Sequence, residues 1–410
     1  MSTVTPAEPS EPAFDIDALL APAVGALDPP TALSPLPYDL NAGVPDRPSL
    51  PWRELADAAR RALEANAGDA LTYGGAAGYE PLRAWIAARQ AAETGIEVTS
   101  AQVTLASGSA AAIDTIAATF VGAGDLVITG APTYPGAIRA FKARGATILD
   151  VQQDDDGLRM DALEDTLRAQ RAAGRRVKLI YVVATYDNPS GATLPLDRRE
   201  RLAALSREYG TLIVEDDAYA GIDLDGPPPT SLFQVARGQG ILRVGTFSKT
   251  IASGLRVGWV VAEPRIVQRL NFMRFDNGAS PFVHHTVLAY LQGGTFDSHV
   301  ARLRDLYRER RDASAAALIE HCEPYVTFRS PAGGFFHWLH LRPGLDARAV
   351  FEACQRHGVA VTPGQSYYPN GGGNDRVRLV YSALRPDELR EAVARVGRAL
   401  EEVATAGRGK

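Results

Sequence analysis

The chain alternates short, nearly continuous apolar runs with amphipathic segments over most of its length. The apolar runs lie at 103–107, 125–130, 178–185, 211–217, 241–248 and 258–264. After the first run, Ile113, Ile116, Ala117 and Phe120 follow the i, i+3, i+4, i+7 spacing of one helix face. Val/Ile/Leu runs separated by helices are typical of parallel strands that are covered on both faces. We therefore expect an α/β fold with a mainly parallel sheet flanked by helices.

The pattern changes after about residue 290. A long charged helix is predicted over 298–321, followed by the apolar runs 335–341 and 377–384 and by a closing amphipathic helix. This order predicts a smaller C-terminal α+β domain. We divide the chain into an N-terminal tail or arm at 1–45, a large domain at 46–290 and a small domain at 291–410. Residues 1 to about 12 are rich in Pro, Ser, Thr and Glu and are predicted to be disordered.

Composition narrows the classes of function. The formal net charge of the 410 residues is -5, which gives no basic field for nucleic acid. The two cysteines, Cys322 and Cys354, are too far apart for a zinc site and too few for a disulfide framework, so a reducing compartment fits. The N-terminus carries acidic residues and prolines where a signal peptide would be basic, and no uncharged run reaches a membrane-spanning length. We expect a cytoplasmic protein that binds neither nucleic acid nor a membrane.

Residues with catalytic or binding potential follow directly after the predicted strands. In an open α/β sheet, ligands bind beyond the carboxyl ends of the parallel strands. Ser109 and Ala110 open a helix there, and its free N–H groups and positive end suit a phosphate. The next strand ends bring Tyr134, Asn188, Asp216 with Asp217 and Tyr219, and Lys249 followed by Arg256.

These residue types together are what pyridoxal 5'-phosphate (PLP) requires. A lysine amine forms an imine with the cofactor, and a carboxylate keeps the pyridine nitrogen protonated so that the ring can accept electrons. Taken singly, each residue is typical of a helix cap, a turn or a surface pair. Their occurrence at successive strand ends favours a cofactor site with Lys249 as the Schiff-base lysine.

Several longer motifs resemble one enzyme family. They are LTYGGAAGYEPLR, ASGSAAAID, APTYPGA, YDNPSGATLPLDRR, VEDDAY, GTFSKTIASGLRVGW, GGFFHW and RVRLVYSA. The chain from about residue 40 to the C-terminal helix is similar to fold-type I, class I/II aminotransferases, in the branch with α-aminoadipate and kynurenine aminotransferases and MocR-type regulators. The resemblance implies an amino-acid aminotransferase that uses PLP and a 2-oxo acid by a ping-pong mechanism.

The resemblance also implies roles for individual residues. Lys249 holds the cofactor and moves the proton, Asp216 pairs with the pyridinium, Asn188 and Tyr219 contact the ring hydroxyl oxygen, and Tyr134 stacks on the ring. Ser109, Ala110, Thr246, Ser248 and Arg256 hold the phosphate, with Tyr73 reaching in from the second subunit of a homodimer. Arg378 grips the substrate α-carboxylate, beside the substrate-binding residues Asn188 and Gly43.

The histidines do not suggest a metal site. His284 and His285 are adjacent and lack a third ligand. His337 and His340 lie three apart in a predicted strand, so their side chains should project to opposite faces. We assign no metal.

Departures from the family pattern leave other reactions open. Ala110 stands where many relatives have glutamine, and Asn41 and Ala42 replace part of an apolar-glycine run. The segment 272–291 is unusual, and Asn277, Ser280 and His284 could line an altered pocket of the neighbouring subunit. A PLP-dependent lyase, or an oxygen-using decarboxylase or oxidase, is therefore the alternative. A transcription regulator on this fold would need an added basic winged-helix domain, and the approximately 40 residues before the family-like region are acidic and proline-rich.

Overall fold

An eight-stranded sheet organises the larger part of the molecule. The computed structural model describes residues 14–25, 27 and 34–408, so the predicted disorder of residues 1–12 lies outside the described part. The strand order is β2-β9-β8-β7-β6-β3-β4-β5. β8, β7, β6, β3 and β4 run parallel to one another, and β9 and β5 run in the opposite direction. β2 pairs antiparallel with β9 and therefore runs in the same direction as the five parallel strands. The strands are β2 Val103–Ala106, β3 Leu126–Ala131, β4 Thr147–Asp154, β5 Gly157–Leu158, β6 Val177–Val182, β7 Leu212–Asp216, β8 Ile241–Thr246 and β9 Gly258–Val261.

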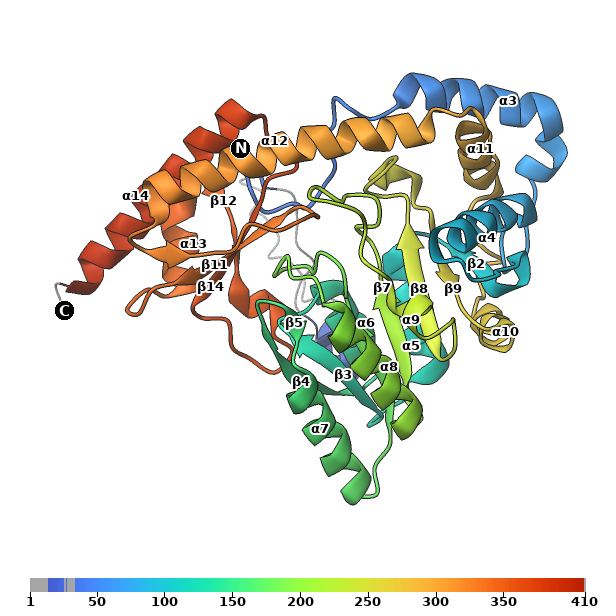
Figure 1. Ribbon diagram of the computed structural model, residues 1–410, viewed down its shortest axis with the longest axis horizontal. Coiled ribbons are helices and arrows are strands. Elements are labelled where there is room, and N and C mark those ends of the chain that lie inside the picture. The colour runs from blue at the N-terminus through green and yellow to red at the C-terminus, as the bar shows by residue number, and fades with distance from the viewer. Residues whose placement is uncertain (1–13, 26, 28–33, 409–410) are drawn as a thin grey trace, which may run out of the picture.

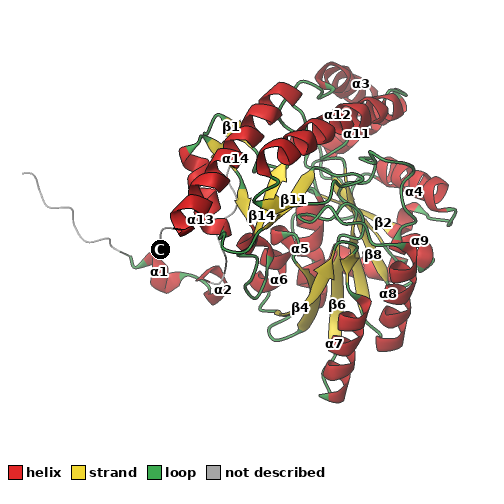
Figure 2. Ribbon diagram, turned by 60° about the vertical axis from the view of Figure 1, so that its left-hand side comes forward, coloured by secondary structure: helices red, strands yellow, loops and turns green. Residues whose placement is uncertain are grey.

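The predicted α/β class is confirmed, because helices cover both faces of this sheet (Figures 1 and 2). Successive strand residues enter different cores: Leu179 and Val214 pack on one face, Ile180 and Ile213 on the other. The first face carries α5 (Ser109–Phe120), α6 (Pro135–Ala143) and α10 (Pro264–Phe272). The second face carries α4 (Glu80–Thr94), α7 (Met160–Ala172), α8 (Leu196–Tyr209) and α9 (Leu232–Val235).

Two strands of the eight-stranded sheet fall outside the predicted apolar runs. β4 and β5 form the edge of the sheet beyond β3. Along β4 the exposure of the side chains varies from residue to residue, and only Ile148 and Val151 are buried. A half-exposed edge strand does not need a continuous apolar sequence, so the search for such runs missed it.

The C-terminal part builds a second, antiparallel sheet of four strands. Its order is β10-β11-β14-β13, and α12, α13 and α14 pack with it. These elements are β10 Val326–Thr327, β11 Phe336–Leu341, β13 Thr362–Pro363, β14 Arg376–Val380, α12 Phe296–Cys322, α13 Ala347–Arg356 and α14 Pro386–Arg408. α12 runs along both parts of the molecule (Figure 1), since Phe296 and Val300 pack in the core of the large sheet and Leu303 and Tyr307 in that of the small one.

The N-terminal segment joins the C-terminal part. β1 (Tyr38–Asp39) pairs with β12 (Val359–Ala360), and Leu40 packs in the core of the small sheet. α3 (Trp52–Ala70) then crosses to the large part, where it packs on α11 (Pro281–Gln292). The remaining short elements are α1 Ile16–Leu19, α2 Pro22–Gly25 and the 3-10 turns Ser100–Gln102, Ser253–Leu255 and Gly364–Tyr367. The domain limits at residues 45 and 290 stay predictions.

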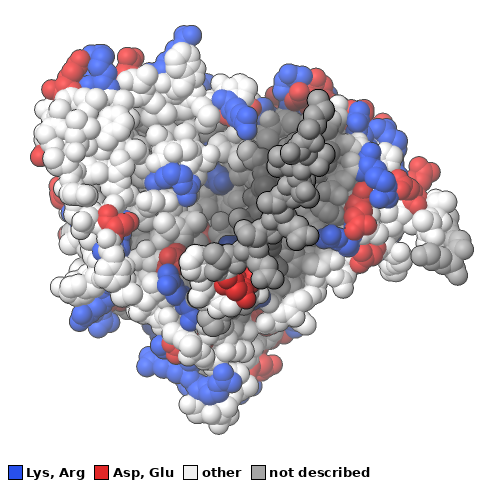
Figure 3. Space-filling model, turned by 180° about the vertical axis from the view of Figure 1, so that it is seen from behind, with Lys and Arg blue, Asp and Glu red and all other residues white. Residues whose placement is uncertain are grey.

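The described residues lack what a membrane-spanning helix or a metal site requires. Within residues 14–25, 27 and 34–408, no helix is both long and apolar enough to cross a bilayer, and no group of three or more His, Cys, Asp or Glu side chains is arranged to hold a metal ion. Positive and negative side chains are interspersed on the face shown in Figure 3.

Candidate active site

A cavity of about 600 Å³ lies at the carboxyl ends of β6, β7 and β8, and it collects the residues predicted from sequence. Its lining includes Gly43, Ser109, Ala110, Tyr134, Asn188, Asp216, Tyr219, Thr246, Ser248, Lys249, Arg256 and Arg378. Both sheets contribute, because Arg378 comes from β14 and the segment 41–44 crosses between the two parts. Tyr73 is the one predicted site residue that lies outside.

The end of the cavity beside α5 forms a tight backbone cradle. Gly108 has a φ of +88°, and a Cβ atom there would lie 2.5 Å from Nη2 of Arg256. A Cβ atom on Gly258 would lie 2.6 Å from the backbone nitrogen of Ser109. Only glycines permit this approach, and the first N–H groups of α5 have no side-chain cap. The hydroxyls of Thr246 and Ser248, 2.8 Å apart, line the same cavity, so the cradle suits a phosphate.

Lys249 is buried in the centre of the cavity. It follows β8 after three residues, and its Nζ donates a hydrogen bond of 2.7 Å to the carbonyl oxygen of Gly43. Burial lowers the pKa of Lys249 to about 8, Arg378 and Arg256 act in the same direction, and Asp216 opposes them. Since the neutral amine is the nucleophile, this environment prepares Lys249 to form an imine near neutral pH.

Asp216 faces the cavity with one carboxylate oxygen already bonded. The hydroxyl of Tyr181 donates to Oδ2 at 2.6 Å, and both side chains are buried. Oδ1 has no hydrogen-bond partner within the described part of the chain. Burial raises the pKa of Asp216 to about 6, and the bond from Tyr181 opposes that rise. An unpaired buried acceptor of this kind fits a protonated ring nitrogen.

Asp217 points away from this cavity. It is the next residue along the chain, and Nε of Arg243 donates to its Oδ2 at 3.1 Å on the other face of the sheet. Asp217 lines a different cavity of about 480 Å³. Because successive side chains of a strand point to opposite faces of the sheet, Asp216 and Asp217 lie on different faces.

Two aromatic rings lie close to the guanidinium of Arg378. Its guanidinium carbon lies 4.5 Å from the ring centroid of Phe336 and 5.2 Å from that of Tyr367. Nη1 donates to Oδ1 of Asn188 at 2.9 Å, and Nη2 donates to the carbonyl oxygen of Asn41. The Nε atom is buried and has no partner among the residues described. A guanidinium fixed in this way can present its edge to a carboxylate.

Two tyrosines bring aromatic rings to the lining. Tyr134 is the N-cap of α6, and Gly136 lets its ring lie close to the helix, since a Cβ atom at Gly136 would be 2.5 Å from the ring. Tyr219 packs edge-on against Phe335 and Phe336, and its ring centroid is 5.8 Å from Nζ of Lys249.

Tyr73 lies on the surface, where 87% of the side chain is exposed. Trp52, Leu71, Phe272 and Phe275 are also exposed apolar side chains, at 62–87%. They come from α3 and the residue after it, and from the end of α10 and the loop that follows. Gly278 of that loop closely approaches the backbone of Gly75. Of the other residues considered in this segment, His284 is buried in α11 and Ser280 caps that helix. None of Asn277, Ser280 and His284 lines the cavity of its own chain.

Sequence reasoning missed four notable residues of the site. Tyr181 lies in an apolar run that was interpreted only as a strand, although the hydroxyl of a buried tyrosine needs a partner and was a usable signal. Tyr367 stacks on Arg378 from the short 3-10 turn before β14. Arg139 and Lys142 line the cavity from α6, and the spacing of four residues from Pro135 to Arg139 places them on the same helix face.

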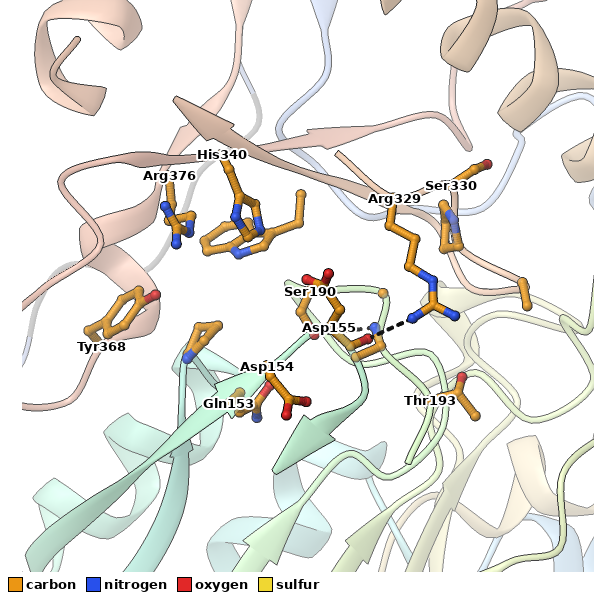
Figure 4. Close-up of a pocket in the computed structure, with 16 residues that line it drawn as sticks. Gln153, Asp154, Asp155, Ser190, Thr193, Arg329, Ser330, His340, Tyr368 and Arg376 are labelled. Carbon is orange, nitrogen blue, oxygen red and sulfur yellow. Dashed lines mark hydrogen bonds between the residues drawn. The ribbon is translucent and has the colours of Figure 1, made fainter. Parts of the chain in front are cut away.

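Another, smaller cavity lies between the two parts of the molecule (Figure 4). It measures about 170 Å³ and contains none of the predicted site residues. His340 and Arg376 of the small sheet face Gln153 and Asp154 across it, and Nη1 of Arg329 reaches the carbonyl oxygen of Asp155 at 3.3 Å (Figure 4). It is a cleft between the parts rather than an extension of the cofactor cavity.

Comparisons with known proteins agree with this geometry. The family model described as aminotransferase class I and II matches residues 37–396. The aromatic-amino-acid aminotransferase 1 of Thermococcus litoralis is 31% identical over 88% of this chain and 88% of its own. The 2-aminoadipate transaminase of Thermus thermophilus is 34% identical over 88% of this chain and 89% of its own. The crystal structure of the α-aminoadipate aminotransferase LysN of Thermus thermophilus, complexed with N-(5'-phosphopyridoxyl)-L-leucine, superimposes with a TM-score of 0.89 and 32% identity, covering 96% of this chain and 100% of that one.

The lowered pKa of Lys249 gives a first prediction. In the cofactor-free protein, the reactivity of Lys249 towards an amine-labelling reagent should rise with pH and reach half its maximum near pH 8, because the neutral amine predominates above that value. Competitive acetylation with peptide mass spectrometry measures this for each of the four lysines separately. A midpoint near 10.5, the ordinary lysine value, would contradict the proposed desolvation.

The bond from Tyr181 to Asp216 gives a second prediction. Tyr181→Phe removes the donor that lowers the pKa of Asp216, so the carboxylate should take up its proton at higher pH. A hydrogen bond to a charged group is worth about 1.5–3 kcal/mol, which corresponds to a rise on the order of one pH unit or more. PLP binding weakens at low pH as Asp216 becomes protonated. When the dissociation constant is measured from pH 5 to 9, the midpoint of this weakening should lie higher in the variant by that amount.

The matched control removes another buried tyrosine hydroxyl. Tyr186 donates to Asp223 at 2.9 Å outside the cofactor cavity, and Tyr186→Phe should leave the pH midpoint of PLP binding unchanged. Equal displacement in both variants would assign the effect to general loosening of the fold.

Proposed function

Because the chain belongs to the class I and II aminotransferase family and is a PLP-dependent amino-acid aminotransferase, we propose that the residues gathered in its 600 Å³ cavity carry out the reaction. The observation that supports this most is the meeting of Lys249, the unpaired Oδ1 of Asp216 and the stacked Arg378 in one cavity. The similarity to named aminotransferases favours transamination over the lyase or oxidase alternative.

The role of each residue follows from its contacts. When bound, PLP supplies an electron sink that makes the α-hydrogen of an amino acid acidic. Asp216, with its free oxygen, would hold the ring nitrogen protonated, and the cradle at Ser109 with Arg256 would hold the phosphate. Tyr134 would cover the ring. The amine of Lys249, with a pKa lowered to about 8, would take the α-proton from the donor amino acid. In the second half-reaction it would give a proton to the α-carbon derived from the 2-oxo acid.

Arg378 and its neighbours would orient the substrate. A bidentate bond to the α-carboxylate fixes the amino acid at two points and suits the planar guanidinium. Asn188 accepts from Arg378 on one side and lines the cavity on the other, so it would serve both substrate and cofactor, and Gly43 lies opposite as an acceptor. Since the same group binds amino acids and 2-oxo acids in turn, we propose a ping-pong exchange between them.

We also propose that two copies of the chain form the working unit. The exposed apolar side chains around Tyr73 would be covered in a homodimer, and Tyr73 would reach the phosphate cradle of the second subunit. The two buried free thiols, Cys322 and Cys354, suit the reducing cytoplasm.

The proposed function predicts a reversible half-reaction. Purified protein loaded with PLP should convert its cofactor to pyridoxamine phosphate when mixed with a substrate amino acid, and a 2-oxo acid should restore the original spectrum. Lys249→Ala should lose this conversion by several orders of magnitude while the fold persists, because the proton carrier is removed. Release of ammonia or carbon dioxide, or consumption of oxygen, with no pyridoxamine form would overturn the proposal.

The shared site predicts complementation between defective subunits. Tyr73→Phe should weaken PLP binding about tenfold, the effect expected for one lost hydrogen bond. A heterodimer of Lys249→Ala with Tyr73→Phe would contain one site with both native residues, so the PLP affinity of its active site should recover to the wild-type value, and its activity at saturating PLP should be roughly half that of the wild type. Co-expression with two affinity tags isolates the heterodimer. No recovery would mean that Tyr73 acts within its own subunit or not at all.

A further inference from the structure

The cavity of about 480 Å³ that Asp217 lines has no part in the proposed reaction. We call it the α4 cavity, because it lies between α4, the carboxyl end of β8 and the start of α12. Asp216 faces the cofactor cavity, so the two cavities lie on different faces of the large sheet, and Thr246 lines both. The volume of the α4 cavity falls in the range of about 300–1,000 Å³ that is usual for small-molecule sites.

Aromatic rings form one wall of the α4 cavity. The ring of Phe247 connects them, since its centroid lies 4.7 Å from that of Trp259, 6.0 Å from that of Phe296 and 6.2 Å from that of Trp85. Gly245 makes room for this cluster, because a Cβ atom there would overlap the indole ring of Trp259. Both indoles are only partly buried, so each keeps a surface free for contact. Such a wall suits a planar aromatic molecule.

Two buried hydrogen-bond donors in the lining have no acceptor. Nη1 of Arg243 and Nε2 of Gln90 lack a partner among the described residues, and the two residues are only 9% and 6% exposed. Burial alone would lower the pKa of Arg243, but Asp217 raises it overall, with a contribution from Glu93 of α4. The guanidinium therefore lies near the C-terminal end of α4, which also carries Gln90. A ligand oxygen that accepts from these donors would remove an unfavourable burial.

The charged side chains of the lining already balance one another. Each of the three arginines has a carboxylate partner that also lines the cavity: Arg89 with Glu93 at 2.8 Å, Arg304 with Asp223 at 2.9 Å, and Arg243 with Asp217. The described lining therefore has no net charge. An ionic ligand would bring a charge that nothing in the cavity matches, so these pairs favour a neutral ligand.

We propose that the α4 cavity is a second ligand site, which takes a neutral aromatic molecule that carries a carbonyl or amide oxygen. The ring of the ligand packs on the aromatic wall. Its oxygen, which has two lone pairs, accepts from Gln90 and Arg243. The ligand binds without covalent change, and PLP can occupy the cofactor cavity at the same time. This site does not depend on the roles proposed for the residues of the cofactor cavity.

Phenylacetamide, a phenyl ring with a neutral amide, is the probe that tests this site, and toluene is its counterpart without an acceptor. Calorimetric titration of the PLP-loaded protein measures the Kd of each compound. Gln90→Leu removes one donor and nearly keeps the size of the side chain. It should raise the Kd of phenylacetamide roughly three- to tenfold, as expected for one lost hydrogen bond, and should not weaken the binding of toluene.

Gln170→Leu is the matched control. Gln170 is also a helical glutamine, and its Oε1 is buried without a partner within the described part of the chain, but it lies on α7 outside the α4 cavity. Gln170→Leu should leave the Kd of phenylacetamide at the wild-type value. Unchanged PLP loading of both variants shows that they fold, and a crystal structure of the complex should place the phenyl ring on Phe247 and the amide oxygen at Arg243.

Several results would overturn the proposal. One is that the wild type does not bind phenylacetamide at millimolar concentration. Another is that PLP and phenylacetamide compete, or that both glutamine variants bind the amide equally, because the amide would then lie elsewhere. If Gln90→Leu weakens the binding of phenylacetate as much as that of phenylacetamide, the site takes anions and the neutral class of ligand is wrong. None of these measurements involves turnover, so a failure of the proposed transamination would leave the site standing.

Discussion

Three consecutive acidic residues lie at the carboxyl end of the central strand β7: Glu215 and Asp216 are its last residues and Asp217 directly follows. The hydrogen bonds and ion pairs that balance these buried charges determine the arrangement of the site. All three are buried. Because side chains alternate along a strand, Glu215 and Asp217 lie on one face and Asp216 on the other. A buried carboxylate that lacks hydrogen bonds or a partner charge would be protonated or would destabilise the fold, so each face needs its own solution.

The two faces solve this problem in different ways. Glu215 accepts the first N–H groups of α9, from Leu232 at 2.7 Å and Phe233 at 2.9 Å, and Arg243 bonds to Asp217. On that face both carboxylates therefore have hydrogen-bond donors within the protein. On the other face, Tyr181 satisfies only one oxygen of Asp216. The incomplete compensation leaves a buried acceptor with a raised pKa, which a protonated cofactor ring would complete.

Sequence was sufficient for the features that repeat along the chain and insufficient for those that depend on contacts between distant segments. The apolar runs predicted β2, β3, β6, β7, β8 and β9, and strand ends brought the cavity residues together, because the geometry of an open parallel sheet is general. The family and cofactor expected from the motifs are confirmed by the comparisons, whereas the individual roles stay predictions. Neither the bond from Tyr181 nor the stacking of Tyr367 on Arg378 has a signature in local spacing, since each joins residues that meet only in the folded chain.

The segment 41–46, which lines the cavity at residues 41–44, is held by a buried ion pair. Nη2 of Arg310 in α12 donates to Oδ1 of Asp46 at 2.5 Å, and Ser382 donates to the carbonyl oxygen of Val44 at 2.6 Å. These contacts tie the segment 41–46 to the small sheet. The same segment supplies the carbonyl oxygens that accept from Lys249 and Arg378. Since α12 also packs on the large sheet, one helix fixes the substrate arginine, the segment 41–46 and the lysine strand relative to one another, and a movement of the small part would change the cavity at Lys249 and Arg378 together.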